Sequence, residues 1–503
     1  MLNVRKPDPV GHNAAAMAND RLTGLDASFL AMERAGAHMH VGSVLVFEGD
    51  APPYEDFVAK IEQRLHLVPR YRQKLAWPPL VQSRPVWIDD PHFNARYHVR
   101  HTALPAPAGE DDLARLAGRV FAQGLDRSKP LWELWLVDRV GDDAFALISK
   151  THHALVDGVS GVDISTVLFD LEADPPEPDP APAWYPRPEP SPAALLAASV
   201  AERATTPVDA VRGALGAARH PERAVGSSGR AVKGLASMAA AGVSGAPPSP
   251  LNVRIGSHRR FAWVDADLER FKAIKSALGG TVNDAVLAAV AGALRAFLIR
   301  RGRDPEGIEL KAMVPVSVRA DAERGALGNR VAAMYAPLPV HTADAKERFA
   351  LVHAAMGGLK ESGQAVGAEV LTRLAGFAAP TVLDQAARLQ TRQRFFNIVV
   401  TNVPGPQFPL YLQGRRLRAF YPQVPLTLNT ALGIAIMSYD GRLGFGLLGD
   451  YDALPDLDAV ADDLEHAIDE LAVAAGLADG APAPPRTGGP RRKAPAGRKA
   501  ATT

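Results

Sequence analysis

The chain has 503 residues, 47% of them hydrophobic and 22% charged, and a formal net charge of +1. This composition is that of a globular protein long enough for two or three domains, and the near-neutral charge favours neither nucleic acid nor a strongly acidic partner. The chain has no cysteine, which excludes disulfides, cysteine-based metal sites and thiolate nucleophiles, so a covalent acyl intermediate would need serine, threonine or another residue.

The N-terminal segment 1–24 is polar and mixed, without the apolar core of a signal peptide. The longest apolar run, 285–294, falls well short of the roughly 18–20 residues that a membrane-spanning helix needs. We therefore expect a cytoplasmic protein with neither a signal peptide nor a transmembrane helix. If such a protein meets a membrane, it lies on the surface.

Residues 25–170 have the pattern of a compact α/β unit. We expect a strand at 41–47, followed by helices at 54–65 and 111–125. A hairpin of two strands, 132–140 and 144–151, comes next, and a third helix covers 160–171. The hairpin is indicated by the turn Gly141-Asp142-Asp143. The inward face expected of the third helix consists of Val162, Val167, Leu168 and Leu171.

A proline-rich segment, 174–191, is typical of a stiff linker. The alanine-rich stretch 193–243 that follows allows two interpretations: a helical excursion that packs on the body, or an amphipathic helix for a lipid surface. Packing is favoured over lipid binding, because the stretch has few large apolar residues to serve as anchors in a lipid surface.

A second α/β unit spans about 252–475. Thr281 stands at the N-cap position of a strong helix, 281–300. The expected strands are 311–318, 331–338, 396–401 and 434–439, and a terminal helix covers 456–476. The tail after residue 480 is predicted to be disordered and is basic, with Arg486, Arg491, Arg492, Lys493, Arg498 and Lys499 and no acidic residue. Such a tail is most often solvated; otherwise it touches anionic lipid or nucleic acid.

The string His152-His153-Ala154-Leu155-Val156-Asp157-Gly158 carries the chemistry. An imidazole can take a proton from a hydroxyl near neutral pH, so His153 is the predicted general base for acyl transfer to an alcohol. His152 is a supporting residue, Asp157 holds the local turn, and Gly158 permits close backbone approach. The plainer interpretation is a pair of polar residues between a strand and a helix. A metal site at His152, His153 and Asp157 is disfavoured, because no further ligand of matching spacing is evident.

Three other strings have simple structural interpretations. Gly444–Gly449 matches GxGxxG, but it follows a hairpin turn and leads into no helix, so we interpret it as unrelated to dinucleotide binding. Asn283-Asp284 could be ordinary charge placement at a helix start. Asn402–Pro406 could be a turn at a strand end.

Taken in order, these strings resemble the bacterial bifunctional wax ester synthase/acyl-CoA:diacylglycerol acyltransferase family over about residues 22–475. The HHxxxDG string alone is shared with other CoA-dependent acyltransferases and with peptide-synthetase condensation domains. The full set is more specific and consists of Leu25–Leu30, His38–Gly42, Pro130–Glu133, His152–Gly158, Asn283-Asp284, Leu327–Arg330 and Asn402–Pro406.

The resemblance implies an α/β (α+β) fold of two chloramphenicol-acetyltransferase-like domains, with mixed sheets flanked by helices and an active-site tunnel between them. The ranges we expect are 1–21 for an N-terminal segment, 22–173 for the first domain, 174–251 for the linker and excursion, 252–479 for the second domain, and 480–503 for the tail.

The resemblance also implies direct acyl transfer from acyl-CoA to diacylglycerol or a long-chain alcohol, with His153 as the base and no metal or other cofactor. The residues it carries over as substrate-binding or supporting are Pro130, Leu131, Trp132, Asn283, Asp284 and Asn329. Asn283 is one candidate donor to the developing oxyanion. Members of the family associate peripherally with membranes and lipid inclusions, and no nucleic-acid partner is expected.

Two alternatives remain open at this point. The chemistry could be the same with another acceptor, such as a polyketide alcohol. A protein of the same fold could instead bind lipid or coat an inclusion without catalysis, although a binding protein has no need of a base at His153.

Overall fold

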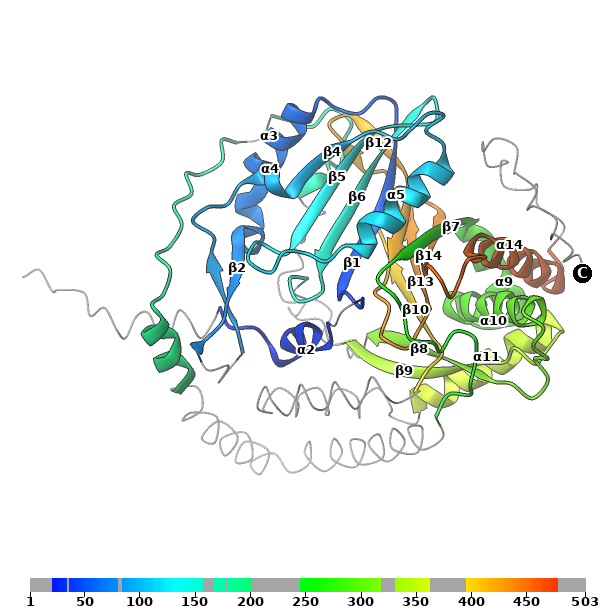
Figure 1. Ribbon diagram of the computed structural model, residues 1–503. Coiled ribbons are helices and arrows are strands. Elements are labelled where there is room, and N and C mark those ends of the chain that lie inside the picture. The colour runs from blue at the N-terminus through cyan, green and yellow to red at the C-terminus, as the bar shows by residue number, and fades with distance from the viewer. Residues whose placement is uncertain are drawn as a thin grey trace, which may run out of the picture.

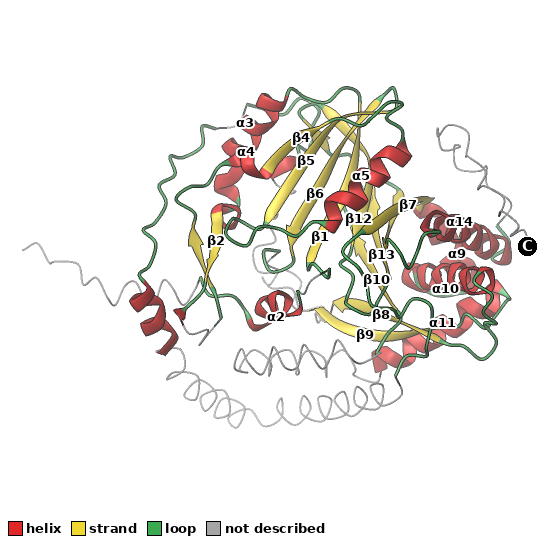
Figure 2. Ribbon diagram, in the orientation of Figure 1, coloured by secondary structure: helices red, strands yellow, loops and turns green. Residues whose placement is uncertain are grey.

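The computed structural model describes residues 20–33, 36–79, 84–156, 167–177, 179–200, 245–317, 331–361 and 395–477. Two six-stranded mixed sheets lie side by side, each with helices against it (Figures 1 and 2). The helices α3, α4 and α5 accompany the first sheet, and α9, α10, α11 and α14 cover the outer face of the second.

The first sheet has the strand order β11-β12-β1-β6-β5-β4. Its strands are β1 (His40–Glu48), β4 (Val99–Thr102), β5 (Trp132–Val140), β6 (Ala144–His152), β11 (Tyr411–Leu412) and β12 (Arg415–Gln423). Every residue of β6 is buried, because the side chains of Phe145 and Leu147 enter one apolar cluster and those of Ala146 and Ile148 another. A strand covered on both faces is expected to be continuously apolar rather than alternating.

The second sheet has the order β7-β14-β13-β10-β8-β9. Its strands are β7 (Arg259–Asp267), β8 (Leu310–Ser317), β9 (Val331–Leu338), β10 (Ile398–Pro404), β13 (Leu432–Tyr439) and β14 (Arg442–Asp450). The helices that can be bounded within the described residues, besides short 3-10 turns, are α2 (Gly24–Met32), α3 (Tyr54–Arg64), α4 (Ala95–His98), α5 (Glu110–Ala122), α9 (Leu268–Leu278), α10 (Val282–Arg300), α11 (Ala345–Glu361) and α14 (Leu457–Ala474). A small separate hairpin consists of β2 (Gln73–Ala76) and β3 (Val86–Asp89).

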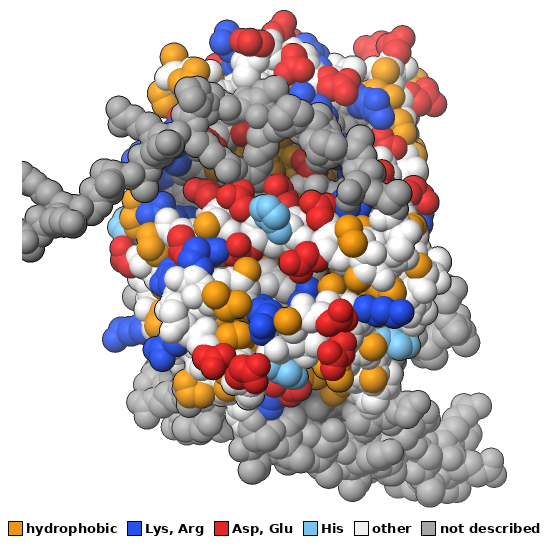
Figure 3. All heavy atoms as spheres, turned by 90° about the vertical axis from the view of Figure 1, so that its right-hand side faces the viewer, with side chains coloured by type: hydrophobic (Ala, Val, Ile, Leu, Met, Phe, Trp, Pro, Cys, Tyr) orange, Lys and Arg blue, Asp and Glu red, His pale blue; other side chains and the backbone are white. Residues whose placement is uncertain are grey.

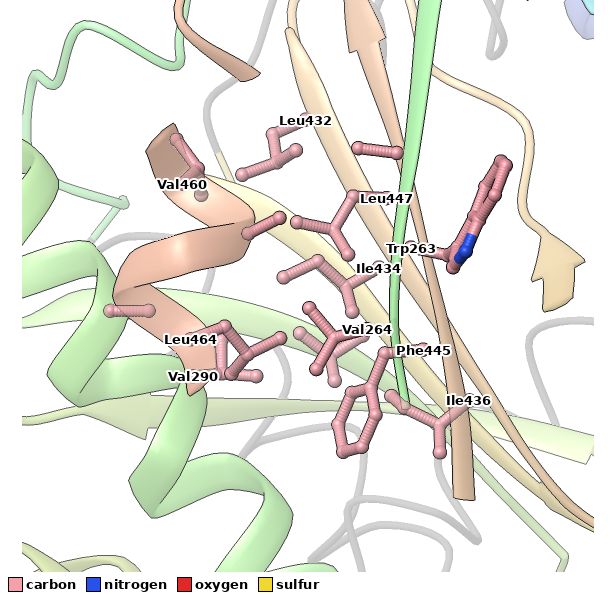
Figure 4. Close-up of a cluster of buried hydrophobic side chains, with 14 of the residues drawn as sticks. Trp263, Val264, Val290, Leu432, Ile434, Ile436, Phe445, Leu447, Val460 and Leu464 are labelled. Atoms are coloured by element: carbon pink, nitrogen blue, oxygen red, sulfur yellow. The ribbon is translucent and has the colours of Figure 1, made fainter. Parts of the chain in front are cut away.

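The main core lies between the second sheet and its helices. Figure 4 shows strand residues such as Ile434 and Leu447 directed toward Val460 and Leu464 of α14, while Trp263 points to the other side of the sheet. There its ring stacks on Tyr421 of β12, with centroids 5.0 Å apart. The outer helical face carries acidic, basic and hydrophobic side chains intermixed (Figure 3). Ion pairs such as Arg270 with Asp469 link these helices at the surface.

Helix α10 follows the sequence pattern closely. Thr281 is its N-cap and forms a capping box with Asp284, and the helix is buried along most of its length. Of the helices in the described part of the chain, α10 is the one long and apolar enough to cross a membrane, but 72% of its most apolar window is buried inside the protein. Its apolar character is therefore that of a core helix packed against α9, α11 and α14.

The two halves of the sequence are joined by a crossover. Strands β11 and β12 come from the C-terminal half, yet β12 pairs with β1 in the first sheet, with Gly42 opposite Gln423. The string Gly444–Gly449 lies in β14, after a hairpin turn in which Asp440 and Gly441 both have positive φ. A Cβ atom at Gly446 would lie 1.8 Å from the carbonyl oxygen of Pro422 in β12. These glycines therefore allow the close approach of the crossing strand.

Several predicted segments differ from the structure or lie outside its described part. The strand expected at 396–401 begins at Ile398 and continues to Pro404, so the Asn402–Pro406 string begins inside β10. Val167 and Leu168 are buried as predicted, but Leu171 is 70% exposed and does not face inward. The chain has already left the helix there, because Asp170 forms a β-bridge with Tyr411. Val162 and the tail after 477 lie outside the described residues.

The linker is bound to the first domain. The main-chain N–H of Arg187 donates to Asp89 (2.9 Å), and its guanidinium contacts Asp89 and Asp20. At the start of the alanine-rich stretch, Leu195 is buried against the β2–β3 hairpin beside Val86. This start packs on the body as favoured, and residues 201–244 lie outside the described part.

We predict that Gly446→Ala destabilises the fold by about 1–3 kcal/mol or more, because the new methyl group forces the backbone of β12 to shift. Gly357→Ala is the control: it lies in α11 with no atom within 4 Å of the added Cβ, and should be neutral or stabilising by up to about 1 kcal/mol. Urea unfolding of both variants checks this, and equal stability would contradict the role assigned to Gly446.

Candidate active site

The two histidines of the HHxxxDG string lie where β6 ends. His152 is the last residue of β6 and is opposite His40 of β1 in the antiparallel ladder. His153 follows, and its main-chain N–H donates to the carbonyl of Met39 at 2.8 Å. The chain then turns, with Leu155 N–H donating to the carbonyl of His152. Asp157 and Gly158 lie outside the described residues, so their roles stay predictions.

The imidazole of His153 stacks on Phe29 of α2, with ring centroids 3.8 Å apart and planes at 18°. Burial lowers the pKa of His153 to about 4, against the opposing effect of a hydrogen bond to its own main chain. Only Nδ1 can reach the main chain of its own residue, so we assign the proton to Nδ1. Nε2 then carries the free lone pair, as a general base requires.

His152 has a different environment. It is 1% exposed, its main-chain N–H donates to Leu131 O at 2.9 Å, and its Nδ1 accepts from Ala154 N–H at 3.0 Å. The proton of the neutral ring is therefore on Nε2, which lies 3.5 Å from Oε2 of Glu33. That distance is long for a hydrogen bond but close enough for attraction between the N–H and the carboxylate. Because its Nδ1 already accepts from Ala154 N–H and its ring is buried, His152 is suited to support rather than to accept a proton.

Glu33 is the charged centre of this cluster. Its carboxylate accepts from Nε of Arg127 at 3.0 Å and lies 3.3 Å from Nδ1 of His38. Burial alone raises the pKa of Glu33, but the contacts with His152, His38 and Arg127 outweigh it and hold the pKa well below the usual range. Glu33 is therefore ionised at neutral pH, with Arg127 as its counter-charge.

A second layer of buried polar groups lies behind the histidines. Lys150 is fully buried, and its Nζ contacts Glu133 at 3.1 Å and donates to the carbonyls of Val120 and Gln123 at the end of α5. Nε2 of His40 bonds to the carbonyl of Phe121 at 2.9 Å. Burial, with the nearby charge of Lys150, holds the pKa of His40 well below its ordinary value. These contacts fix the ends of β1 and β6 against α5.

The Pro130-Leu131-Trp132 string contacts this site through its backbone. Leu131 and Trp132 are 0% and 1% exposed, and the Leu131 carbonyl is the acceptor for His152. The indole of Trp132 donates to the carbonyl of Tyr71 at 2.8 Å and stacks on His98 at 4.6 Å. Of the two roles predicted for these residues, this geometry corresponds to support, because neither side chain is open to a substrate.

The Asn283-Asp284 string lies elsewhere. Asp284 accepts from Thr281 N–H at 2.9 Å and lies 2.8 Å from Nδ1 of His353 on α11. Among the described residues, no hydrogen bond or ion pair links Asn283 or Asp284 with the histidine pair. Asn329 lies outside the described part. The structure thus brings together the histidines and Pro130–Trp132, and leaves Asn283-Asp284 in the helical layer of the second sheet.

Sequence patterns did not single out Phe29, Glu33 or Arg127. Phe29 lies within the Leu25–Leu30 string that contributed to the resemblance, but nothing in that string indicates a contact 124 positions along the chain. Glu33 follows Phe29 by four residues, and this helical spacing was the one available signal.

A cavity of about 580 Å³ lies between the β2–β3 hairpin and the linker, where Lys74, Trp77 and Glu189 contribute to its walls. Neither His152 nor His153 lines it, so it is separate from the site described above. Within the described ranges, no cluster of histidine and acidic side chains has an arrangement that could hold a metal ion.

Comparison with known proteins gives consistent matches along the chain. Residues 22–286 match the family model described as the wax ester synthase/diacylglycerol acyltransferase catalytic domain, and residues 327–472 match the WS/DGAT C-terminal domain. A Mycobacterium tuberculosis protein (strain ATCC 25618 / H37Rv) named as a probable diacylglycerol O-acyltransferase is 33% identical over 466 residues, which are 90% of this chain and 96% of that one.

Solved structures agree with this. The wax ester synthase/diacylglycerol acyltransferase from Marinobacter aquaeolei VT8 superposes with a TM-score of 0.64 at 30% identity, covering 91% of this chain and 100% of that one. The TRI3 trichothecene 15-O-acetyltransferase from Fusarium sporotrichioides has a TM-score of 0.55 at 13% identity, covering 90% and 94%, and shares the fold alone. The predicted fold class, two mixed-sheet α/β domains of the chloramphenicol-acetyltransferase and condensation-domain type, is confirmed.

Proposed function

The chain belongs to the wax ester synthase/diacylglycerol acyltransferase family and is an acyltransferase, and from this premise we propose that it moves a long-chain acyl group from acyl-CoA to the hydroxyl of diacylglycerol, of a long-chain alcohol, or of both. Its products would be triacylglycerol or wax ester, with free CoA. The family membership supports acyl-CoA and a hydroxyl acceptor as the substrate classes.

The observation that carries the proposal is the state of His153. Its low pKa leaves the ring neutral at pH 7, it directly follows the last residue of the central strand β6, and no hydrogen bond among the described residues occupies Nε2. A non-catalytic lipid-binding protein has no use for an imidazole held in this way. General base catalysis needs the acceptor hydroxyl within about 3 Å of that nitrogen.

The proposed step balances without a covalent enzyme intermediate. Nε2 of His153 takes the hydroxyl proton as the acceptor oxygen attacks the thioester carbonyl carbon. The new C–O bond forms, the C–S bond breaks, and the CoA sulfur leaves with the proton that His153 then returns. The absence of cysteine from the chain agrees with direct transfer, since the thiolate nucleophile of an acyl-enzyme route is lacking.

The first test is release of CoA from palmitoyl-CoA by the purified protein, with hexadecanol or a diacylglycerol as acceptor. We expect acceptor-dependent release, and a loss of about 10²–10⁴-fold in His153→Ala. His466→Ala, an exposed histidine on α14, is the matched control and should retain full activity. Full release of CoA by His153→Ala would overturn the assignment of the base. If neither hexadecanol nor the diacylglycerol supports CoA release by the unaltered protein, the assignment of the acceptors is overturned.

The pH dependence follows from the pKa of His153, about 4. For an ordinary imidazole with a pKa of about 6.5, the neutral fraction falls roughly tenfold between pH 7.5 and pH 5.5. His153 stays neutral over that interval. We therefore expect kcat/KM to change less than about twofold from pH 7.5 to 5.5 and to fall as the pH approaches 4. A tenfold fall by pH 5.5 would show a base with an ordinary pKa.

We also propose that the protein works in the cytoplasm, bound peripherally to the inner membrane face or to lipid inclusions. The support is that its proposed acceptors partition into lipid, while α10, the apolar helix of spanning length among the described residues, is buried in the core. Liposome flotation tests this: the purified protein should float with vesicles that contain diacylglycerol. Protein that stays in the lower fractions at all lipid compositions would rule the proposal out.

A further inference from the structure

We propose that α2 positions the histidine pair, with Phe29 fixing the ring plane of His153 and Glu33 fixing the ring of His152. The inference rests on the proposed function, in which His153 is the base. Phe29 of α2 and Glu33, the residue that caps the C-terminal end of α2, act through the histidines and are positioning residues.

The contact between Phe29 and His153 is close and nearly parallel, at 3.8 Å and 18°. The main chain of His153 is held by the Met39 carbonyl, which leaves rotation of the ring as the freedom that remains. An aromatic face against the imidazole restricts that rotation and excludes water from one side. A base must be held to within a fraction of an ångström and some tens of degrees to be effective.

Glu33 acts on the neighbouring ring. Nδ1 of His152 accepts from Ala154 N–H, so the ring proton is on Nε2, which lies 3.5 Å from the carboxylate of Glu33. Arg127 in turn fixes Glu33, and it also donates to the carbonyl of Leu30 in α2 at 3.1 Å. Because His152 and His153 are consecutive, a tilt of the first ring would shift the backbone that carries the second.

Phe29 and Glu33 are one helical turn apart. The N–H of Glu33 donates to the Phe29 carbonyl at 3.2 Å, so the two side chains leave the same end of α2. Figure 1 shows this helix beyond the end of β1 where His40 begins the strand. In α2 only Gly24 and Leu30 are buried. Leu30 joins one apolar cluster and Phe29 packs against the other, so the helix is anchored on the body of the protein while Phe29 also contacts His153.

The test compares steady-state kinetics of Phe29→Leu and Phe29→Tyr. Leucine keeps apolar volume but removes the flat face, so kcat should fall about tenfold or more while KM for palmitoyl-CoA stays within about twofold. Tyrosine should restore kcat to within about threefold. Phe408→Leu, at a half-exposed position after β10, is the matched control and should be unchanged. Unchanged kcat in Phe29→Leu, or equal losses in the leucine and tyrosine variants, would overturn the proposal.

Glu33 gives an independent arm. Glu33→Ala should lower kcat about tenfold, and Glu33→Gln, which keeps an acceptor oxygen at the same reach, should recover part of that loss. If Phe29 and Glu33 position the histidine pair as one unit, the losses of kcat in Phe29→Leu and Glu33→Ala will not be additive in the double variant. Full additivity would mean that they act separately.

A readout without turnover separates this inference from the proposed function. The titration of His153 can be followed by NMR of histidine-labelled protein, with the signal assigned by its loss in His153→Ala. Removing the Phe29 ring admits water, so the pKa of His153 should rise toward its ordinary value in Phe29→Leu and not in Phe29→Tyr. An unchanged titration would overturn the positioning role, whether or not acyl transfer is seen. Absence of acyl transfer by the unaltered protein would instead overturn the proposed function.

Discussion

Strand β1 is hydrogen-bonded on both sides, to β6 from its own half of the chain and to β12 from the other half. The rest of the site depends on this double pairing. The β6 ladder places His152 opposite His40, and the β12 ladder holds a strand of the C-terminal half within the first sheet. Gly36, in the loop that leads from α2 into β1, gives its carbonyl to Arg259 of the second half. Residues from both halves of the chain thus hold β1, the strand that faces His152, so the position of the histidine pair depends on both halves.

The polar cluster around that strand is costly in free energy. Lys150 and Glu33 are largely removed from water, and burial of a charge is unfavourable unless its partners are well placed. Each of them has at least two partners, which come from different elements of the fold. An apolar cluster of the same size would stabilise the protein at least as well. What the polar cluster provides is a single geometry, because hydrogen bonds fix direction where apolar contacts do not.

Local signals in the sequence were sufficient for many elements. The N-cap at Thr281, the hairpin around Gly141 and the apolar run of β6 are determined by neighbouring residues, and each was predicted. The same holds for the hairpin turn before Gly444–Gly449, which was predicted and is the turn between β13 and β14. Contacts between distant residues were not accessible in this way. The pairing of β12 with β1 and the contacts of Phe29 and Glu33 join positions about a hundred or more apart, and a single sequence has no periodicity that marks them. The prediction that Leu171 faces inward was wrong for a related reason. The β-bridge between Asp170 and Tyr411, a residue distant in the sequence, ends the helix before Leu171.

The low pKa of His153 is better understood as a consequence of burial than as its purpose. An imidazole with the ordinary pKa is already about three-quarters neutral at pH 7, so lowering the pKa to about 4 raises the amount of competent base by only about a third. The same change makes His153 a weaker base, which by itself slows proton transfer. Burial must therefore be useful in another way. A thioester exposed to a base and to water is hydrolysed, and Phe29, which covers one face of the His153 ring, limits the water that can reach this base. The orientation of His153 then offsets its lower basicity. The stacked and hydrogen-bonded surroundings of the histidine pair therefore contribute to catalysis as well as to stability.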